Sequence, residues 1–171
     1  MAPRKSWREK LADSKDLPKV VEIDETMSKR WGTGTVVIPA PTEVDGIMRS
    51  VPEGKLITIN EIREILAQWH GASIGCPMTT GIFAWVAANA AGEDEEDGVE
   101  DITPYWRTLK SNGELNPKYP GGIENLKARL EAEGHTVIHK GKKTVVKDYR
   151  SHLIESSQYL SMQPSSVMKE T

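Results

Sequence analysis

Hydrophobic residues recur at helical spacing in four stretches of the chain, and we predict a helix in each. The stretches cover residues 44–51, 58–70, 79–91 and 123–133. The second is the best defined, because Thr58 and Glu61 stand three apart as a capping box before the apolar face begins. Gly71 follows at the position where a helix end favours a left-handed residue.

The predicted helix at 79–91 carries small residues beside its apolar stripe, so a neighbouring helix could approach it closely. The stripe consists of Ile82, Phe83, Val86 and Ala90, and the small residues are Ala84, Ala87 and Ala88. Together with the helix at 58–70 it is compatible with a helix-turn-helix. That pattern alone is a weak signal, because most helix pairs bind nothing.

Runs of β-branched and aromatic residues predict short strands around these helices. One strand is expected at 35–38 and another at 105–109, while 136–139 and 143–147 read as a β-hairpin. The tip of this hairpin is rich in lysine, with Lys140, Lys142 and Lys143 close together. These lysines either protect a solvated edge strand or contact phosphate, and the sequence leaves both readings open.

This order of elements indicates one α/β domain at residues 35–154, with a charged, partly ordered arm at 1–34 and a disordered tail at 155–171. The chain has 171 residues, 37% of them hydrophobic and 27% charged, which suits one soluble domain. No apolar run approaches the roughly 20 residues that span a bilayer. The basic start lacks the apolar core of a secretory signal. We therefore expect a cytoplasmic monomer that does not bind membranes.

Charge is distributed unevenly along the chain, although the net charge is only −3. Seven of the nine residues at 93–101 are acidic, and we expect a mobile surface loop there. From 102 to 150 there are ten Lys and Arg against five Asp and Glu. A nucleic-acid-binding face would therefore have to be local.

Five short motifs follow one another between residues 52 and 135. They lie at 52–58 (PEGKLIT), 80–89 (TGIFAWVAAN), 104–107 (PYWR), 119–123 (YPGGI) and 131–135 (EAEGH). In order and spacing they resemble the active-site domain of alkylguanine-DNA alkyltransferases, and still more the cysteine-free alkyltransferase-like proteins. The resemblance implies a winged-helix-like α/β domain with a helix-turn-helix, short strands and a terminal β-hairpin.

The resemblance also implies that alkyl transfer is lost. The family's acceptor motif is Pro-Cys-His-Arg, whereas this chain has Pro104-Tyr105-Trp106-Arg107. A phenol with an ordinary pKa of about 10 is a poor substitute for a thiolate, and an indole N–H cannot take up a proton. Glu133 matches the glutamate that orients the family's histidine, and with no histidine to orient we expect a solvent-exposed carboxylate. We expect neither enzymatic activity nor a cofactor.

The family positions that handle DNA map onto seven residues of this chain: Tyr105, Trp106, Arg107, Tyr119, Thr80, Ile59 and Asn89. Thr80 stands in the place of an arginine finger, and Ile59 in the place of a tyrosine that helps to rotate the flipped nucleotide. The resemblance makes Tyr119 a pocket wall and Asn89 a hinge residue that bonds backbone. The Tyr105-Trp106 pair would either stack on an extruded base or fill a redundant pocket as core.

Other reactive residue types carry weaker signals. The one cysteine, Cys76, excludes an internal disulfide and is expected to be a buried structural residue. His135, His139 and His152 do not have metal-ligand spacing, so no metal site is expected.

Two functions from different classes remain at this stage. The first is a non-enzymatic alkyltransferase-like protein that binds double-stranded DNA and recognises alkylated guanine or distorted bases in DNA repair. The second is an adaptor on a degenerate alkyltransferase fold, in which the acidic segment 93–101 binds another protein. A positive face around Arg107, Lys127 and Lys142, with the acidic segment folded away, would favour DNA. An acidic segment lying across the pocket would favour the adaptor.

Overall fold

The computed structural model describes residues 6–155, which form a mixed α/β fold of helices and short strands. The α-helices are α1 (Trp7–Ala12), α2 (Glu25–Trp31), α3 (Pro41–Arg49), α4 (Ile59–His70), α5 (Pro77–Glu96) and α6 (Gly122–Ala132). The strands are β1 (Lys19–Glu22), β2 (Thr35–Ile38), β3 (Ile57–Thr58), β4 (Ile74–Gly75), β5 (Thr108–Leu109), β6 (Val137–Lys140) and β7 (Lys143–Val146). Two 3₁₀ helices, η1 (Tyr105–Arg107) and η2 (Tyr149–His152), complete the described part.

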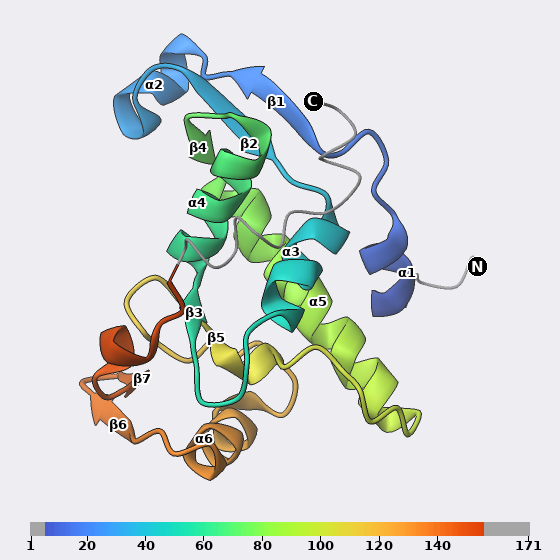
Figure 1. Cartoon of the computed structure of the whole chain (residues 1–171), viewed down its shortest axis with the longest axis vertical. Coiled ribbons are helices and arrows are strands. Elements are labelled where there is room, and N and C mark those ends of the chain that lie inside the picture. The colour runs from blue at the N-terminus through green and yellow to red at the C-terminus, as the bar shows by residue number, and fades with distance from the viewer. Residues whose placement is uncertain (1–5, 156–171) are drawn as a thin grey trace.

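The strands form three small sheets around a central helix pair. In the first sheet, β2 pairs antiparallel with β1 and parallel with β4. In the second, β3 and β5 are parallel, and β6 and β7 form the antiparallel hairpin. Figure 1 shows the β1–β2–β4 sheet at one end of the molecule and α6 with the hairpin at the other, with α5 running between them.

The core lies between α3, α4 and α5. Its fully buried side chains include Ile47, Met48, Ile62, Leu66 and Ala87. The predicted start and end of α4 are confirmed: the Thr58 backbone N–H donates to Glu61 Oε1 at 2.8 Å, and Gly71 is left-handed with φ +65°. None of the helices within residues 6–155 is long and apolar enough to cross a membrane.

Residues 6–34 are packed onto the rest of the fold rather than loosely attached. β1 pairs with β2 over four residues, from Lys19 opposite Ile38 to Glu22 opposite Thr35. α1 lies against α5, where the rings of Trp7 and Trp85 meet edge to face at 4.6 Å between centroids. The boundary at residue 34 stays a prediction, as does the tail, which apart from Glu155 lies outside the described residues.

Two expectations about local structure were wrong. The segment 93–101 is not a mobile loop throughout, because α5 continues as far as Glu96. The acidic last turn of α5 lies against Arg8, whose positive charge offsets the carboxylates there. The predicted strand at 105–109 is a 3₁₀ turn followed by the two residues of β5, and the N–H of Arg107 closes that turn onto the carbonyl of Pro104 at 3.1 Å.

Candidate nucleic-acid interface

A pocket of about 420 Å³ opens between the start of α4, one face of α5 and the loop that leads to Tyr119. Its wall is apolar and aromatic, formed by Ile59, Met78, Ile82, Trp85 and Tyr119. Lys110, Asn116 and Lys118 also line it and supply polar and cationic groups. We call it the α5 pocket. Its size lies in the usual range of about 300–1,000 Å³ for small-ligand sites.

One face of α5 forms the floor of the α5 pocket. Met78, Gly81, Ile82 and Trp85 are spaced three and four residues apart and therefore lie on the same side of the helix. Met78 is 68% exposed and Ile82 is 51% exposed, which is unusual for large apolar side chains. A Cβ placed on Gly81 would meet nothing within 4 Å, so this glycine leaves the floor hollow.

The opposite face of α5 explains why these large residues lie outside. Thr80, Ala84, Ala87, Ala88 and Ala91 are all buried, and these small side chains let α5 pack closely on its neighbours. The prediction that Ile82 belongs to the buried stripe was therefore wrong. The small residues make the core contact, and the bulky ones face the α5 pocket.

Tyr105, at the position of the family's nucleophile, is part of the core. It is 1% exposed, and its hydroxyl accepts a hydrogen bond from Nδ2 of Asn125 at 3.0 Å. Burial raises the pKa of this phenol, against the opposing effects of Arg129 and the Asn125 hydrogen bond. The group is neutral near pH 7 and is not poised to act as a nucleophile.

Trp106 and Arg107 both bond to Glu133, which follows α6. The indole Nε1 of Trp106 donates to Glu133 Oε2 at 2.8 Å, and Arg107 Nη2 donates to the same oxygen at 2.7 Å. Arg107 Nη1 also donates to the carbonyl of Val51 at 2.7 Å. Arg107 is therefore an internal structural group in this arrangement and is not free to contact phosphate.

The expectation of a solvent-exposed Glu133 was wrong, because its side chain is only 7% exposed. Burial alone would raise its pKa, but hydrogen bonds from Arg107, Trp106 and the Gly54 N–H outweigh burial and lower it. The glutamate keeps a ring N–H partner after the histidine is lost, since the indole of Trp106 takes that place. The motif that the sequence resembles has histidine at this position, and tryptophan also has a ring N–H donor. The contact between Trp106 and Glu133 could therefore have been predicted from the sequence.

The other predicted DNA-handling residues are placed unevenly. Tyr119, predicted as a pocket wall, lines the α5 pocket, and so does Ile59, which the sequence indicated to be a core-type residue. Thr80 is fully buried, and the large exposed side chains near it on α5 are Met78 and Ile82. Asn89 does not reach across a hinge through its Nδ2, which donates instead to the carbonyl of Trp85 in its own helix at 2.9 Å.

Tyr119 lies between the Tyr105–Trp106 pair and the α5 pocket. Its ring packs edge to face on Tyr105, with 6.4 Å between centroids, and it is 4% exposed. Tyr105 and Trp106 do not line the α5 pocket, and Tyr119 is the aromatic side chain that connects them to it. Burial raises the pKa of Tyr119 as well.

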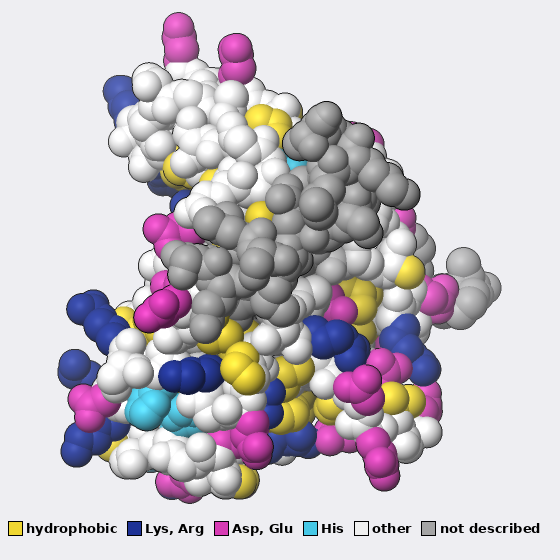
Figure 2. Space-filling view, viewed as in Figure 1, with side chains coloured by type: hydrophobic (Ala, Val, Ile, Leu, Met, Phe, Trp, Pro, Cys, Tyr) yellow, Lys and Arg dark blue, Asp and Glu magenta, His cyan; other side chains and the backbone are white. Residues whose placement is uncertain are grey.

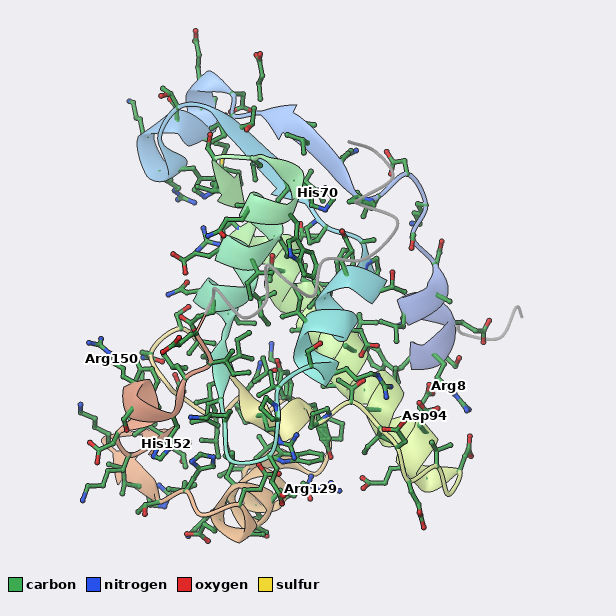
Figure 3. The ribbon with its side chains drawn as sticks, viewed as in Figure 1. Arg8, His70, Asp94, Arg129, Arg150 and His152 are labelled. Carbon is green, nitrogen blue, oxygen red and sulfur yellow. The ribbon has the colours of Figure 1, made fainter. Side chains whose placement is uncertain are left out.

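The acidic segment 93–101 begins beside the loop that carries Tyr119, where Gly92 packs against Pro120, and extends away from the Met78–Ile82 face of α5. Glu93 follows Ile82 by eleven residues on α5, which corresponds to about 16 Å along the axis. Arg8 of α1 approaches Asp97 at 2.7 Å and Asp94 at 3.4 Å, and Figure 3 shows Arg8 and Asp94 together at this end of the helix. Arg129 of α6 pairs with Glu95 in the same region.

Sequence reasoning missed most of the residues that line the α5 pocket. Met78, Trp85, Lys110, Asn116 and Lys118 were not singled out, although an isolated glycine inside an otherwise helical pattern at Gly81 is a signal for a packing or functional position. Cys76 is buried, with its sulfur 3.1 Å from the Thr79 hydroxyl. Within the described residues no group of three or more His, Cys, Asp or Glu side chains could hold a metal ion.

Two solved structures are similar to this chain. The chain is similar to an alkyltransferase-like protein. The similar structures are S. pombe Atl1 in complex with damaged DNA containing O6-carboxymethylguanine and S. pombe ATL in complex with DNA. Each has 20% sequence identity to this chain and a TM-score of 0.49. Each match covers 67% of this chain and 94% of the similar chain.

No family model matches this chain, and no curated protein matches it either. At 20% identity the likeness to the two S. pombe structures concerns the fold alone. The function of this chain is therefore inferred from its own residues.

Proposed function

We propose that this protein is a non-enzymatic DNA-binding protein that recognises alkylated or distorted bases in DNA repair. In this proposal α4 and α5 act as the two helices of a winged-helix-like domain, with α5 as the recognition helix. The base turns out of the duplex and enters the α5 pocket. The observation that carries the proposal is the exposed apolar face of Met78 and Ile82 around the hollow at Gly81.

The chemistry of the α5 pocket suits an extruded base. Every base has an apolar π-face, and stacking on an aromatic side chain contributes about 1–3 kcal/mol. Trp85, half-buried beside Trp7, provides such a ring, and Tyr119 adds only the 4% of its surface that is exposed. Lys110 and Lys118 provide cations for the flanking phosphates. Met78, at 68% exposure on the first turn of α5, is placed as an apolar wedge between base steps.

The proposal includes no alkyl transfer. Tyr105 is buried, bonded to Asn125 and raised in pKa, so a reactive phenolate is not available near neutral pH. The neighbouring Trp106 has only a donor, which is already committed to Glu133. Binding to DNA would then mark a damaged base without repairing it.

The adaptor on a degenerate alkyltransferase fold is the second candidate. It draws on the exposed part of the acidic segment, where Glu100 and Asp101 face solvent. The pairing of other carboxylates with Arg8 and Arg129 within the chain weakens it. Arg107 is bonded to Glu133 and adds nothing to a positive face, so the position of the acidic segment does not decide between the two candidates.

Fluorescence anisotropy with matched duplexes, one plain and one carrying O6-methylguanine, tests the proposal across a salt series. We expect tighter binding to the modified duplex, with affinity that falls as salt rises. Gly81→Leu fills the hollow and should remove the preference for the modified duplex, a loss of roughly 5- to 160-fold if one stacked base is excluded.

Gly46→Leu is the matched control for this experiment. Gly46 is an exposed helical glycine on α3 whose Cβ would also meet nothing within 4 Å. It should keep the preference, and both variants should be at least as stable as the wild type because leucine favours a helix by roughly 0.5–1 kcal/mol over glycine. No binding of the wild type to either duplex at low salt would contradict the proposal and leave the adaptor.

A further inference from the structure

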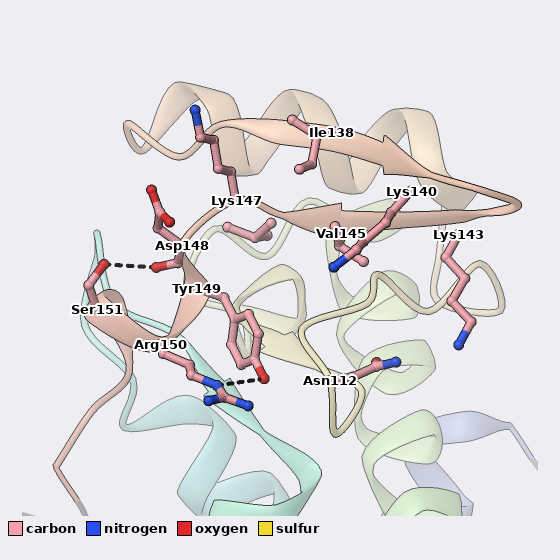
Figure 4. Close-up of a pocket in the computed structure, with 11 residues that line it drawn as sticks. Asn112, Ile138, Lys140, Lys143, Val145, Lys147, Asp148, Tyr149, Arg150 and Ser151 are labelled. Carbon is pink, nitrogen blue, oxygen red and sulfur yellow. Dashed lines mark hydrogen bonds between the residues drawn. The ribbon is translucent and has the colours of Figure 1, made fainter.

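A second hollow, of about 1,010 Å³, lies on the outer face of the β6–β7 hairpin and η2. Four cations line it: Lys140, Lys143, Lys147 and Arg150. Figure 4 shows these side chains around Ile138, Val145 and the ring of Tyr149. We call it the hairpin groove. Asp148 is the one carboxylate among the described residues that line it.

The alternation of side chains along the hairpin produces this surface. In the register of the hairpin, Lys140 is opposite Lys143 and Ile138 is opposite Val145, so these four residues share one face. Lys147 continues the same alternation beyond β7. The other face contributes Val146 to the core. The lysines therefore stand on a supported apolar floor, and Figure 2 shows several Lys and Arg side chains over this part of the molecule.

Tyr149 is held in the hairpin groove by close packing. Gly113 has φ +84°, and a Cβ there would lie 2.3 Å from the Tyr149 ring, so the ring rests directly on this glycine. The Tyr149 hydroxyl accepts from Arg150 Nε at 3.3 Å. An aromatic face with a guanidinium beside it is a combination that binds a nucleic-acid base and its phosphate.

One loop connects the hairpin groove to the α5 pocket. Lys110 lines the pocket and Asn112 lines the groove, two residues further along. This loop is fixed to the hairpin, because the Val146 N–H donates to the Gly113 carbonyl at 3.1 Å and the Leu115 N–H donates to the Thr144 carbonyl at 2.8 Å. The two concave sites therefore share the loop 110–113, and cations line both of them.

We propose that the hairpin groove binds the phosphate backbone of the DNA strand that continues beyond the base in the α5 pocket. This inference rests on the proposed function and extends it to the flanking strand. Lys140, Lys143 and Lys147 neutralise phosphates, and Tyr149 offers a stacking face. These contacts are independent of base type, so they strengthen binding to modified and plain DNA equally.

Charge complementarity favours a polyphosphate over the acidic segment of a second copy. Five of the seven carboxylates of that segment have cationic partners in their own chain. Glu93, Asp94 and Asp97 lie against Arg8, Glu95 against Arg129, and Asp101 against Arg49. The groove also continues to a pocket with a wall suited to a base, which an acidic peptide would not use.

The salt dependence of DNA affinity tests the inference. The variant Lys140→Gln/Lys143→Gln/Lys147→Gln is compared with Lys19→Gln/Lys29→Gln/Arg30→Gln, which removes the same charge from exposed positions in β1 and α2. Each phosphate contact contributes about 0.9 to the slope of log K against log salt on duplex DNA. On a long modified duplex we expect the hairpin variant to lose roughly 2–3 from this slope and the control to keep the wild-type value.

Two further measurements distinguish binding by the hairpin groove from binding by the α5 pocket. The ratio of affinities for modified and plain duplexes should not change in the hairpin variant, and a duplex that ends at the modified base should bind wild type and variant with the same slope. An unchanged slope on the long duplex, in a wild type that binds it, would overturn the inference and leave the proposed function intact. A slope that drops in the hairpin variant without any preference for the modified base would support the groove and contradict the proposed function.

Failure of the wild type to bind either duplex would overturn both proposals. Salt-sensitive self-association that the same three lysine changes abolish without DNA would also overturn the inference, since it would assign the groove to a second copy.

Discussion

Glu133 shows how one buried carboxylate can hold several segments of the chain together. It accepts hydrogen bonds from Trp106, Arg107 and the Gly54 N–H, and so joins η1, the loop before β3 and the end of α6. Arg107 is also well buried, with a side chain 14% exposed. Removal of one partner from such a pair leaves a poorly compensated charge in the protein.

We therefore expect Glu133→Gln to lower the free energy of unfolding by about 3 kcal/mol at neutral pH. The folded state lowers the pKa of Glu133, so its stabilisation is complete above the unfolded pKa of about 4.3 and is lost as the pH falls through the lower folded value. The difference between wild type and variant in urea unfolding should then shrink from about pH 7 to pH 3. Glu131→Gln, at an exposed position on α6, serves as the control. A difference that stays constant with pH would contradict this role.

At the scale of elements, the position of a helix was easier to predict than the direction of its faces. Periodicity and capping placed α4 to within a residue, because local signals determine both of its ends. The same periodicity placed Ile82 in the core, and this prediction was wrong. The buried contact of α5 is made by alanines, which allow a neighbouring helix to approach more closely than larger side chains would. The length of α5 also depended on Arg8, which is distant in sequence and gives no local signal.

A buried histidine, His135, lies where α6, β6 and η2 meet. His135 is 5% exposed, and neither ring nitrogen has a hydrogen-bond partner among the described residues. It faces His152 edge to face, with 4.9 Å between ring centroids. Burial lowers the pKa of His135, and His152 and Arg107 lower it further, while Glu133 opposes them.

Because the folded state disfavours protonation of His135, the unfolded state binds more protons as the pH falls below the unfolded pKa of about 6.5. We expect the urea midpoint of the wild type to decrease between about pH 7.5 and 5.5, and that of His135→Phe to decrease less. Phenylalanine keeps a planar aromatic ring, although a larger one, and removes the two unpaired nitrogens. His139→Gln, on the exposed side of β6, should behave like wild type. An equal decrease in all three proteins would assign the pH dependence to other groups.

At the scale of the whole molecule, charge is sorted into separate regions. The acidic end of α5 is paired with α1 and α6, and the cations of the α5 pocket and the hairpin groove lie on surfaces joined by the loop after β5. The sequence predicted the imbalance between residues 93–101 and 102–150. It could not predict that Arg107 would turn inward or that Lys110 and Lys118 would line one pocket, because those placements depend on contacts between distant segments.

The resemblance of the motifs to alkyltransferase-like proteins indicated the order of elements and the loss of the nucleophile. It assigned Tyr119 as a pocket wall by position, and Tyr119 lines the α5 pocket. The residues that replace the family's DNA-handling groups were not predictable in the same way. Thr80 occupies the position of the finger in sequence, but the exposed apolar surface on that turn belongs to Met78 and Ile82.

The central claim is that a base leaves the duplex and enters the α5 pocket. The most direct measurement is the fluorescence of a 2-aminopurine placed at the target position of a duplex, recorded alongside anisotropy so that binding and extrusion are separated. We predict that wild-type protein raises this fluorescence on binding and that Gly81→Leu binds the same duplex, more weakly, without the rise. An equal rise with Gly81→Leu, or full binding by the wild type with no rise, would contradict the claim.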